Sequence, residues 1–229
     1  MYKLALLGRN ISHSQSPAIY RKLLGENLDY KLFDFSHDKE IPSLEELFSD
    51  DLMGLSITAP YKKHFVDQVH FLNPDLTFSA INCIRRNENN FEATNTDYLA
   101  LEEILNDLLT ANVYSNIVLL GSGSMAEITQ KVLNKLNRSY THLTRKSYGD
   151  LSKIDLSSQI KDEALVLNAC SRDMYFSGNL SRGSTFFDFN YDMKHASVIP
   201  DQKRSIDYID GLNLLYLQAK YALDFWALS

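Results

Sequence analysis

Short apolar runs alternate with longer amphipathic segments along the whole chain. Residues 3–8, 30–35 and 53–58 are short, apolar and bounded by turn or polar residues, which predicts strands. Residues 17–27 and 43–48 predict helices between them, and a hairpin over 80–85 and 91–96 leads into a leucine-rich helix over 97–110. Strands that alternate with helices indicate βαβ units and a mostly parallel sheet.

A second series of the same kind follows residue 115. Residues 116–121, 140–144, 164–169 and 185–189 predict strands, and residues 124–137 predict a helix between the first two. An apolar helix rich in aromatic residues closes the chain over 211–228. Because Ala111 and Asn112 interrupt the helical pattern, we place a boundary within residues 109–115. The pattern predicts an α/β protein of two units with a cleft between them.

Composition narrows the class of protein further. With 45% apolar and 23% charged residues, the 229-residue chain has the averages of soluble globular proteins. A net charge of −6 argues against a general surface for nucleic acid or anionic membrane, although a local pocket for one phosphate remains possible. No apolar run approaches the roughly 20 residues of a membrane span, and the N-terminal run is too short for a signal peptide. We therefore expect a soluble, cytoplasmic protein that binds neither nucleic acid nor a membrane, with Cys83 and Cys170 as reduced, half-buried thiols.

Residues 117–126 carry the most specific local pattern, a strand followed by Gly-Ser-Gly-Ser-Met-Ala and then a helix. In such a G-x-G-x-x-A turn, glycine lets the backbone approach a pyrophosphate, and the helix N-terminus faces the anion. Glycines also serve ordinary β-turns, but the flanking strand and amphipathic helix favour a dinucleotide site. The next strand ends in Leu143-Thr144-Arg145-Lys146, where an NAD site would have a carboxylate. Two adjacent cations suit the 2′-phosphate of NADP, the alternative being a solvated basic loop.

The segment Ser12-His13-Ser14-Gln15-Ser16-Pro17 brings hydroxyls to a loop directly before a predicted helix. Hydroxyls spaced by two residues can face one anionic ligand such as a carboxylate. Alternatively, Ser16 caps a helix whose first residue is Pro17, and this segment alone favours the cap.

Four further segments favour the anion-binding interpretation of the serine loop over the helix cap. They are Gly-Leu-Ser-Ile-Thr-Ala-Pro-Tyr-Lys at 54–62, Ala-Ile-Asn-Cys at 80–83, Ala-Thr-Asn-Thr-Asp at 93–97 and Gly-Leu-Asn-Leu-Leu-Tyr-Leu-Gln-Ala at 211–219. Together with the serine loop they resemble the shikimate dehydrogenase family, in the family's order and over nearly the whole chain. The resemblance implies a substrate-binding α/β domain over 1–110, a Rossmann-type doubly wound NADP-binding domain over 111–207, and a C-terminal helix over 208–229 that returns to the first domain.

The same resemblance implies an NADP-dependent oxidoreductase that reversibly reduces 3-dehydroshikimate to shikimate in aromatic amino-acid (chorismate) biosynthesis, as a monomer or homodimer. By similarity, Lys62 and Asp97 would form the catalytic acid/base pair, which suits a ketone reduction that leaves an alkoxide to be protonated. The implied substrate-binding residues are Ser14, Ser16, Thr58, Asn82, Tyr191 and Gln218. The expected cofactor-binding residues are Gly121, Ser122, Gly123, Ser124, Met125, Ala126, Thr144, Arg145, Lys146, Asn168 and Gly211. No metal is expected, and His142 fits no ligand spacing, so we interpret it as structural.

The chain departs from the family's pattern mainly around the expected cofactor site. It is shorter than typical members, Ser124 falls in the second glycine pair, and Thr144 stands where the family has asparagine. Tyr98 also replaces the glycine that follows Asp97 in the family. A quinate or aminoshikimate dehydrogenase shares the same motifs, and a non-catalytic dinucleotide or metabolite sensor is a further alternative. Retention of both Lys62 and Asp97 favours an enzyme.

Overall fold

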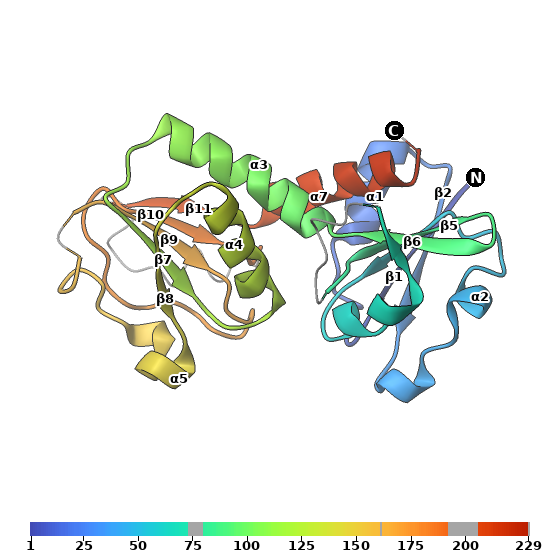
Figure 1. Ribbon diagram of the computed structural model, residues 1–229, viewed down its shortest axis with the longest axis horizontal. Helices are drawn as coiled ribbons and strands as arrows, with labels where there is room; N and C mark the ends of the chain where they lie inside the picture. The colour runs from blue at the N-terminus through green and yellow to red at the C-terminus, as the bar shows by residue number, and fades with distance from the viewer. Residues whose placement is uncertain (73–79, 161, 192–205, 229) are drawn as a thin grey trace. The chain divides into compact units, whose positions relative to one another are not determined.

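A computed structural model describes residues 1–72, 80–160, 162–191 and 206–228 (Figure 1). It contains two compact units, one formed by Met1–Leu99 with Leu215–Ser229 and the other by Ala100–Leu214. The division falls within helices α3 (Thr96–Ala111) and α7 (Leu212–Phe225), so each of these helices begins in one unit and ends in the other. The domain boundaries after residues 110 and 207 remain sequence predictions.

Unit 1 is built on a mixed six-stranded sheet. Its strands β1 (Tyr2–Gly8), β2 (Leu28–Asp34), β3 (Gly54–Ile57), β4 (His70–Phe71), β5 (Cys83–Asn87) and β6 (Asn90–Thr94) lie in the order β2-β1-β3-β5-β6-β4. β1 pairs in parallel with β2 and β3, whereas β5 is antiparallel to both β3 and β6. The predicted hairpin is this β5–β6 pair, and it makes the sheet mixed.

Both faces of the unit 1 sheet are covered. On one face Leu7 and Leu55 belong to a core that includes residues of α2 (Leu44–Leu47) and Phe65, close to the short helical turns Asp38–Glu40, Tyr61–Lys63 and Val66–Gln68. On the other face Leu4 packs with residues of α1 (Ser16–Leu24) and α7. Burial on both sides explains why β1 is a continuous apolar run rather than an alternating one. α1 ends three residues earlier than predicted because Gly25 takes a positive φ of 77°.

The two cysteines differ in burial. Both are free thiols, but Cys83 in β5 is fully buried and only Cys170 is partly exposed. The expectation of a half-buried thiol is therefore wrong for Cys83, because its strand lies in the middle of the sheet with the core on that side. Burial raises the pKa of the Cys83 thiol well above its ordinary value, which keeps it neutral and unreactive.

An ion pair on the β5–β6 hairpin predicts a pH-dependent contribution to stability. Glu92 faces Arg85 across the strands (Nε to Oε2, 2.7 Å) and accepts a bond from the Asn87 amide at 2.7 Å. The Asn87 bond and then the Arg85 charge lower the pKa of Glu92 below its ordinary value. A carboxyl with a lowered folded-state pKa stabilises the fold above its unfolded pKa and loses that contribution as the pH falls.

We therefore expect Glu92→Gln to reduce the free energy of unfolding at pH 7 by about 0.5–1 kcal/mol, as for other partly exposed pairs. The difference from the wild type should begin to shrink below about pH 4.3, the unfolded pKa, and should disappear only below the lowered folded-state pKa, where the carboxyl is protonated in both states. Urea denaturation at several pH values measures it, and a difference that does not change with pH would show that the charge is not responsible.

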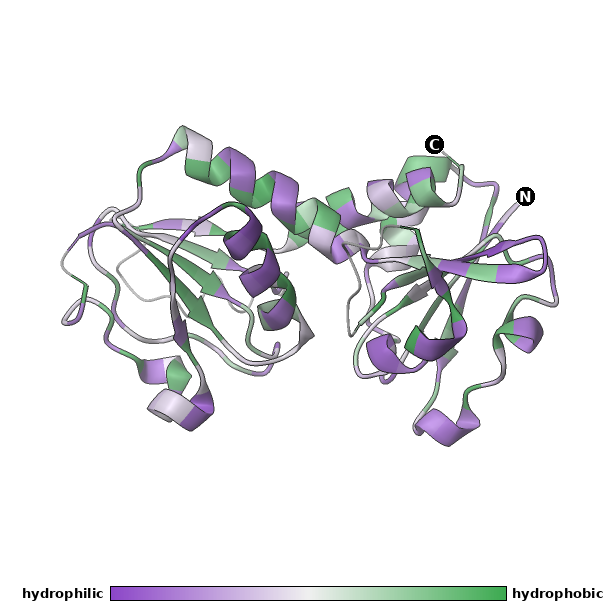
Figure 2. Cartoon of the chain, viewed as in Figure 1, coloured by the Kyte–Doolittle hydropathy of each residue, from purple (hydrophilic) through white to green (hydrophobic). Residues whose placement is uncertain are grey.

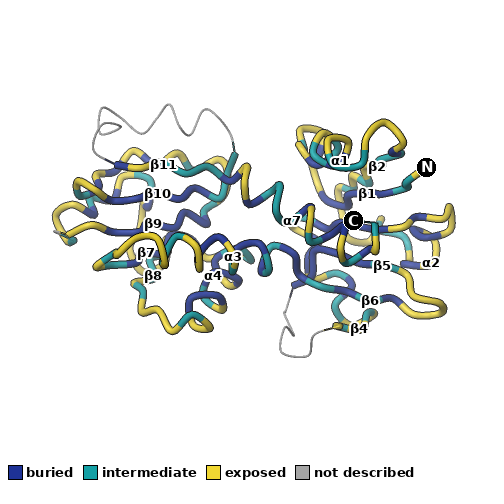
Figure 3. Tube along the Cα trace, turned by 90° about the horizontal axis from the view of Figure 1, so that it is seen from above, coloured by how far each residue is buried: buried dark blue, intermediate teal, exposed yellow. Residues whose placement is uncertain are grey.

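Unit 2 holds a five-stranded, wholly parallel sheet. β7 (Asn116–Leu120), β8 (Thr141–Leu143), β9 (Ala164–Asn168), β10 (Thr185–Asp188) and β11 (Asp207–Ile209) lie in the order β11-β10-β9-β7-β8. α4 (Ser124–Lys135) connects β7 to β8 and packs against β7, and α5 (Arg145–Tyr148) and the turn Leu151–Lys153 follow β8. The apolar strands and the hydrophilic outer side of α4 are visible in Figure 2, and the burial of β9 and β10 in Figure 3. The predicted Rossmann-type architecture is confirmed.

The strand order of unit 2 indicates where a ligand would bind. After β8 the chain returns to the other side of β7 to form β9, so the order reverses between β7 and β9. In open α/β sheets, ligands bind outside the carboxyl ends of the strands at such a reversal. Gly121 directly follows β7 and Ala169 directly follows β9, so both residues lie beside this reversal. No helix in the described ranges is long and apolar enough to cross a membrane.

Candidate active site

A buried ion pair lies at the carboxyl end of β3 in unit 1. Lys62, in the helical turn Tyr61–Lys63, makes an ion pair through its Nζ with Asp97 Oδ2, and the two side chains are only 11% and 13% exposed. Asp97 stands in the first turn of α3, whose start is capped by Asn95 accepting a bond from the Tyr98 N–H at 3.1 Å. The positive end of the helix dipole favours a carboxylate there. Two residues 35 positions apart thus form one charged, nearly dry pair.

A ring of side-chain hydrogen bonds joins Asn82, Thr96 and Gln218. The Asn82 amide donates to Thr96 Oγ1 at 2.9 Å and lies 3.5 Å from Gln218 Oε1, while its oxygen accepts the Thr96 N–H at 2.7 Å. Thr96 Oγ1 donates to Gln218 Oε1 at 3.1 Å. Thr96 is adjacent to Asp97, so this polar ring borders the ion pair. Thr96 was not among the predicted residues, because a threonine at a helix start has many ordinary roles.

The serine loop forms a compact turn rather than a helix cap. Ser14 Oγ donates to Ser16 Oγ and accepts the Ser16 N–H, each at 3.2 Å. Ser16 is already the first residue of α1, whose N-cap is Gln15 without a side-chain capping bond. The capping interpretation of Ser16 is therefore wrong, because Pro17 falls one position later in the helix than that interpretation requires. The two hydroxyls are left side by side, with Ser16 buried.

Buried hydroxyls of β2, β3 and α1 continue this polar region. Tyr20 Oη lies 3.5 Å from Ser56 Oγ, and the Tyr20 and Tyr30 rings stack with centroids 5.3 Å apart. The Tyr30 hydroxyl is buried and interacts with the Ser56 and Ser16 side chains, but it makes no hydrogen bond of good geometry within the described residues. Burial raises the pKa of both tyrosines, and the Asp97 charge adds to the rise in the pKa of Tyr20. These neutral hydroxyls lie between the serine loop and the ion pair, and no local sequence pattern signals them.

Thr58 completes the predicted substrate residues of unit 1. It follows β3 directly, donates its backbone N–H to the Leu7 carbonyl at 2.9 Å, and is partly exposed. Its methyl group would lie 2.5 Å from a Cβ at position 8, so Gly8 leaves the space that Thr58 occupies. The remaining implied residue of the substrate site, Tyr191, belongs to unit 2, where it follows β10 and is half-buried.

The turn between β7 and α4 presents several backbone N–H groups that have no hydrogen-bond acceptor among the described residues. Gly121 has a φ of 112°, and a Cβ there would lie 2.7 Å from the Ala169 carbonyl oxygen, so only glycine fits. The backbone N–H groups of Ser122, Gly123, Ser124 and Met125 make no hydrogen bond within the described parts of the chain. No side chain caps α4, and Gly123 faces open space. This geometry suits a pyrophosphate, which needs close backbone approach and several N–H donors. Ala126, buried behind the turn, is small as the motif requires.

Two exposed cations stand at the end of β8. Arg145 and Lys146 are the first residues of α5, and Thr144 caps this helix by accepting the Ser147 N–H at 3.1 Å. Burial raises the pKa of the Cys170 thiol to about 11, and the Arg145 charge opposes that rise. Arg145 therefore lies within electrostatic reach of the loop after β9, beside the reversal in strand order. The Thr144 hydroxyl accepts the capping bond, and Arg145 and Lys146 beside it are charged groups that can hold a phosphate.

The other predicted cofactor residues are buried. Asn168 bonds the Asp188 carboxylate at 3.1 Å and accepts the Cys170 N–H at 3.2 Å, which orders the loop after β9. At Gly211 a Cβ would lie 2.2 Å from the Phe189 carbonyl oxygen, so glycine there permits close backbone packing. Asp188, which anchors Asn168, was missed because a lone aspartate at a strand end carries no motif.

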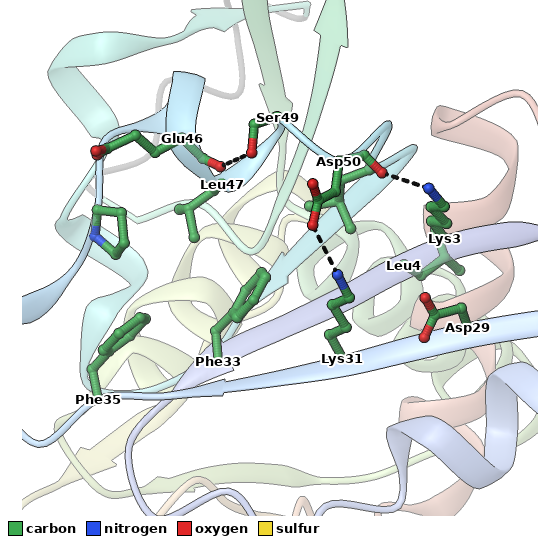
Figure 4. Close-up of a pocket in the computed structure, with 12 residues that line it drawn as sticks. Lys3, Leu4, Asp29, Lys31, Phe33, Phe35, Glu46, Leu47, Ser49 and Asp50 are labelled. Atoms are coloured by element: carbon green, nitrogen blue, oxygen red, sulfur yellow. Dashed lines mark hydrogen bonds and ion pairs between the residues drawn. The ribbon is translucent and has the colours of Figure 1, made fainter.

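A hollow of about 180 Å³ in unit 1 lies apart from these residues (Figure 4). Phe33, Phe35 and Leu47 line it together with charged groups that are already paired, such as Lys31 with Asp50 at 3.2 Å. None of the predicted site residues borders it. Among the residues described, no three His, Cys, Asp or Glu side chains are grouped so as to hold a metal ion.

Comparison with known proteins agrees with the motifs. Residues 6–84 match the family described as the shikimate dehydrogenase substrate binding domain. The shikimate dehydrogenase (NADP(+)) of Clostridium botulinum is 23% identical over 252 residues, which cover 100% of this chain and 98% of that protein. The shikimate dehydrogenase of Sulfurisphaera tokodaii is 26% identical, over 97% of this chain and 88% of that protein.

Solved structures show that the fold is shared along the chain. Shikimate dehydrogenase 1 from Peptoclostridium difficile matches with a TM-score of 0.74 and 23% identity, over 99% of this chain and 92% of that one. Shikimate 5-dehydrogenase from Thermus thermophilus, solved in complex with NADP(H) and shikimate, matches with a TM-score of 0.72 and 18% identity, over 99% and 93% of the two chains.

Proposed function

We propose that the chain is a member of the shikimate dehydrogenase family, to whose proteins it is similar along its length, and that it catalyses the reversible, NADP-dependent reduction of 3-dehydroshikimate to shikimate. The observation that carries this proposal is the buried Lys62–Asp97 ion pair beside the Asn82–Thr96–Gln218 ring. A buried acid/base pair next to groups that bond hydroxyls is what reduction of a hydroxylated cyclic ketone requires. The reaction would belong to aromatic amino-acid biosynthesis.

In this proposal Lys62 handles the proton. NADPH, when bound, supplies the hydride, and the carbonyl oxygen of the substrate then needs a proton. The Lys62 ammonium donates that proton from Nζ, and in the reverse direction Lys62 accepts it. Asp97 keeps the lysine oriented and its charge stabilised in a site that is nearly dry. The two groups act as one unit, because their side chains form a single ion pair.

The neutral polar groups of unit 1 would hold the substrate in place. Ser14 and Ser16 present adjacent hydroxyls to its carboxylate, and the Tyr30 hydroxyl lies in the same buried region. The hydroxyls of the substrate would exchange hydrogen bonds with Asn82, Gln218 and Thr58. Tyr191 is proposed as a further substrate contact from unit 2. A polar ligand near the Tyr30 hydroxyl would offer it a hydrogen bond of better geometry.

The residues of unit 2 fit NADP. Free N–H donors at the β7–α4 turn suit the pyrophosphate, and no side chain at Gly121 obstructs it. Arg145 and Lys146 would bind the 2′-phosphate, Arg145 through its planar guanidinium. Asn168 and Gly211 would support the cofactor site indirectly. Asn168 orders the loop after β9, and Gly211 permits close packing against the Phe189 backbone.

The proposed function is tested by adding shikimate and NADP to the purified protein and following the absorbance of NADPH. We expect turnover, with a higher kcat/KM for shikimate than for quinate or aminoshikimate. A preference for either of those substrates would move the assignment to the corresponding dehydrogenase. NADPH binding without turnover of any of the three would overturn the enzyme assignment in favour of a sensor.

Cofactor selectivity gives a separate prediction. Arg145→Ala removes a charge-assisted bond to the 2′-phosphate and is expected to raise KM for NADP about 10- to 100-fold, with little change in KM for NAD. Steady-state kinetics with both cofactors measures this. Arg138→Ala is the control, since this exposed arginine precedes β8 rather than following it. Equal changes with NADP and NAD would show that Arg145 does not bind the 2′-phosphate.

A further inference from the structure

The imidazole of His142 connects β8 to α4 and to the residue that follows β7, within the predicted dinucleotide-binding unit. His142 on β8 has Nε2 2.6 Å from the carbonyl oxygen of Gly121, which follows β7. Its Nδ1 lies 3.2 Å from Nε2 of Gln130, on α4. From the sequence alone we assign His142 only a structural role, because Gln130 and Gly121 are 12 and 21 positions away in the chain.

These two contacts assign the tautomer of the neutral ring. A carbonyl oxygen can only accept, so His142 Nε2 carries the hydrogen and donates it to Gly121. The Gln130 amide then donates to the lone pair on Nδ1. The neutral ring with its hydrogen on Nε2 satisfies both bonds, and Gln130 selects this tautomer in the same way that outer groups orient ligating histidines.

The bond to Gly121 constrains the peptide that opens the turn. The Gly121 N–H is held by the Leu143 carbonyl at 3.0 Å and its carbonyl by His142, so both sides of this residue are anchored to β8. In a trans peptide the carbonyl and the next N–H point in opposite directions, so holding the Gly121 oxygen toward β8 directs the Ser122 N–H away from it. That N–H is one of the free donors of the turn.

Because residue 121 is a glycine, its peptide needs the hydrogen bond from His142 to stay in one orientation. The freedom that lets Gly121 adopt a φ of 112° also lets the Gly121–Ser122 peptide rotate at little cost. A rotated peptide would present a carbonyl oxygen where an N–H now stands, and a phosphate would be repelled rather than bound. Ser122 is exposed, so no packing from its own side chain holds the peptide in place.

We infer that His142 is a positioning residue for the dinucleotide: through Gly121 it keeps the Ser122 N–H available to the pyrophosphate. The inference rests on the proposed NADP-dependent function. It assigns His142 no contact with cofactor or substrate, and it makes Gln130 the residue that sets the tautomer. The role is therefore in cofactor affinity and not in the chemical step.

The binding test compares His142→Leu with His142→Gln by titrating NADPH and following its fluorescence. Losing one hydrogen bond to the turn should weaken NADPH binding about five- to tenfold in His142→Leu. His142→Gln keeps an amide donor near the position of Nε2 and should restore most of the affinity. With NADP saturating, kcat and the KM for shikimate should stay within about twofold of the wild type, because the chemical step is untouched. His70→Leu, the same change at an exposed position in unit 1, is the control.

A second measurement keeps the inference separate from the proposed function. Nitrogen-15 NMR of the protein labelled at histidine reports which ring nitrogen of His142 carries hydrogen, without any cofactor. We expect Nε2–H in the wild type and a mixture of tautomers in Gln130→Leu, which should also weaken NADPH binding, but less than His142→Leu does. A ring with hydrogen on Nδ1 alone, or equal NADPH affinity in wild type and His142→Leu, would overturn the inference. Failure of the wild type to bind NADPH would instead overturn the proposed function.

Discussion

Replacing Lys62 with alanine is expected to lower kcat for shikimate oxidation about 10²- to 10⁴-fold, the usual contribution of a positioned acid/base group. The physical reason is that Lys62 is the cation of a largely buried pair in unit 1, so the variant loses the proton donor that the pair holds in position. KM for shikimate should change much less, because the Asn82–Thr96–Gln218 ring and the serine loop are intact in this variant. NADPH absorbance in steady state measures both quantities.

Two controls make the Lys62 result specific. Lys63→Ala alters the adjacent, exposed lysine and should retain turnover. Asp97→Asn should also lower kcat strongly, and the double variant should lose little more than either single one, since residues that act as a unit are not additive. Because Lys62→Ala leaves the Asp97 carboxylate buried without its partner, a thermal melt must accompany the kinetics. Undiminished turnover in a folded Lys62→Ala protein would move the proton transfer to another group.

Trp226→Ala is expected to reduce the free energy of unfolding by about 3–5 kcal/mol, as for other large aromatic residues removed from a core. The indole is 6% exposed and lies against Gly54, where a Cβ would come within 2.2 Å of the ring. It packs on Tyr20 with centroids 5.7 Å apart, and its Nε1–H donates to the Ile84 carbonyl at 3.0 Å. Trp226 thus attaches the C-terminal segment to β3 and β5 within unit 1, together with the Arg85 bond to the Phe225 carbonyl.

Urea denaturation followed by circular dichroism measures this loss, since Trp226 is the sole tryptophan and its fluorescence disappears with it. Trp226→Phe keeps most of the apolar surface but leaves the Ile84 carbonyl without its donor, so it should cost about 1–3 kcal/mol. A change below about 1 kcal/mol in Trp226→Ala would mean that the C-terminal segment contributes little to unit 1. Because this segment carries Gln218, loss of its attachment should also weaken shikimate binding.

The candidate site was partly predictable from sequence, and the limits are physical. Glycine spacing, a strand before it and a helix after it are local, so the β7–α4 turn could be located from residues 117–126 alone. The family motifs named Lys62 and Asp97, and the structure places their side chains in one ion pair. Their catalytic roles, and those of the other site residues, remain predictions that the experiments above test.

By itself the sequence determined the α/β class and the existence and order of most elements, because hydrophobic periodicity and backbone chemistry are properties of neighbouring residues. Its motifs also indicated the resemblance to the shikimate dehydrogenase family. β4, β11 and α5, with two to four residues each, are too short to show a period. Tertiary structure alone decided that Thr96 links Asn82 to Gln218, that Ser16 lies inside its helix, that the Tyr30 hydroxyl lacks a hydrogen bond of good geometry within the described residues, and that His142 holds Gly121. Apolar burial is non-directional and can be recognised from pattern, whereas a hydrogen bond depends on the positions of two atoms that only the folded backbone brings together.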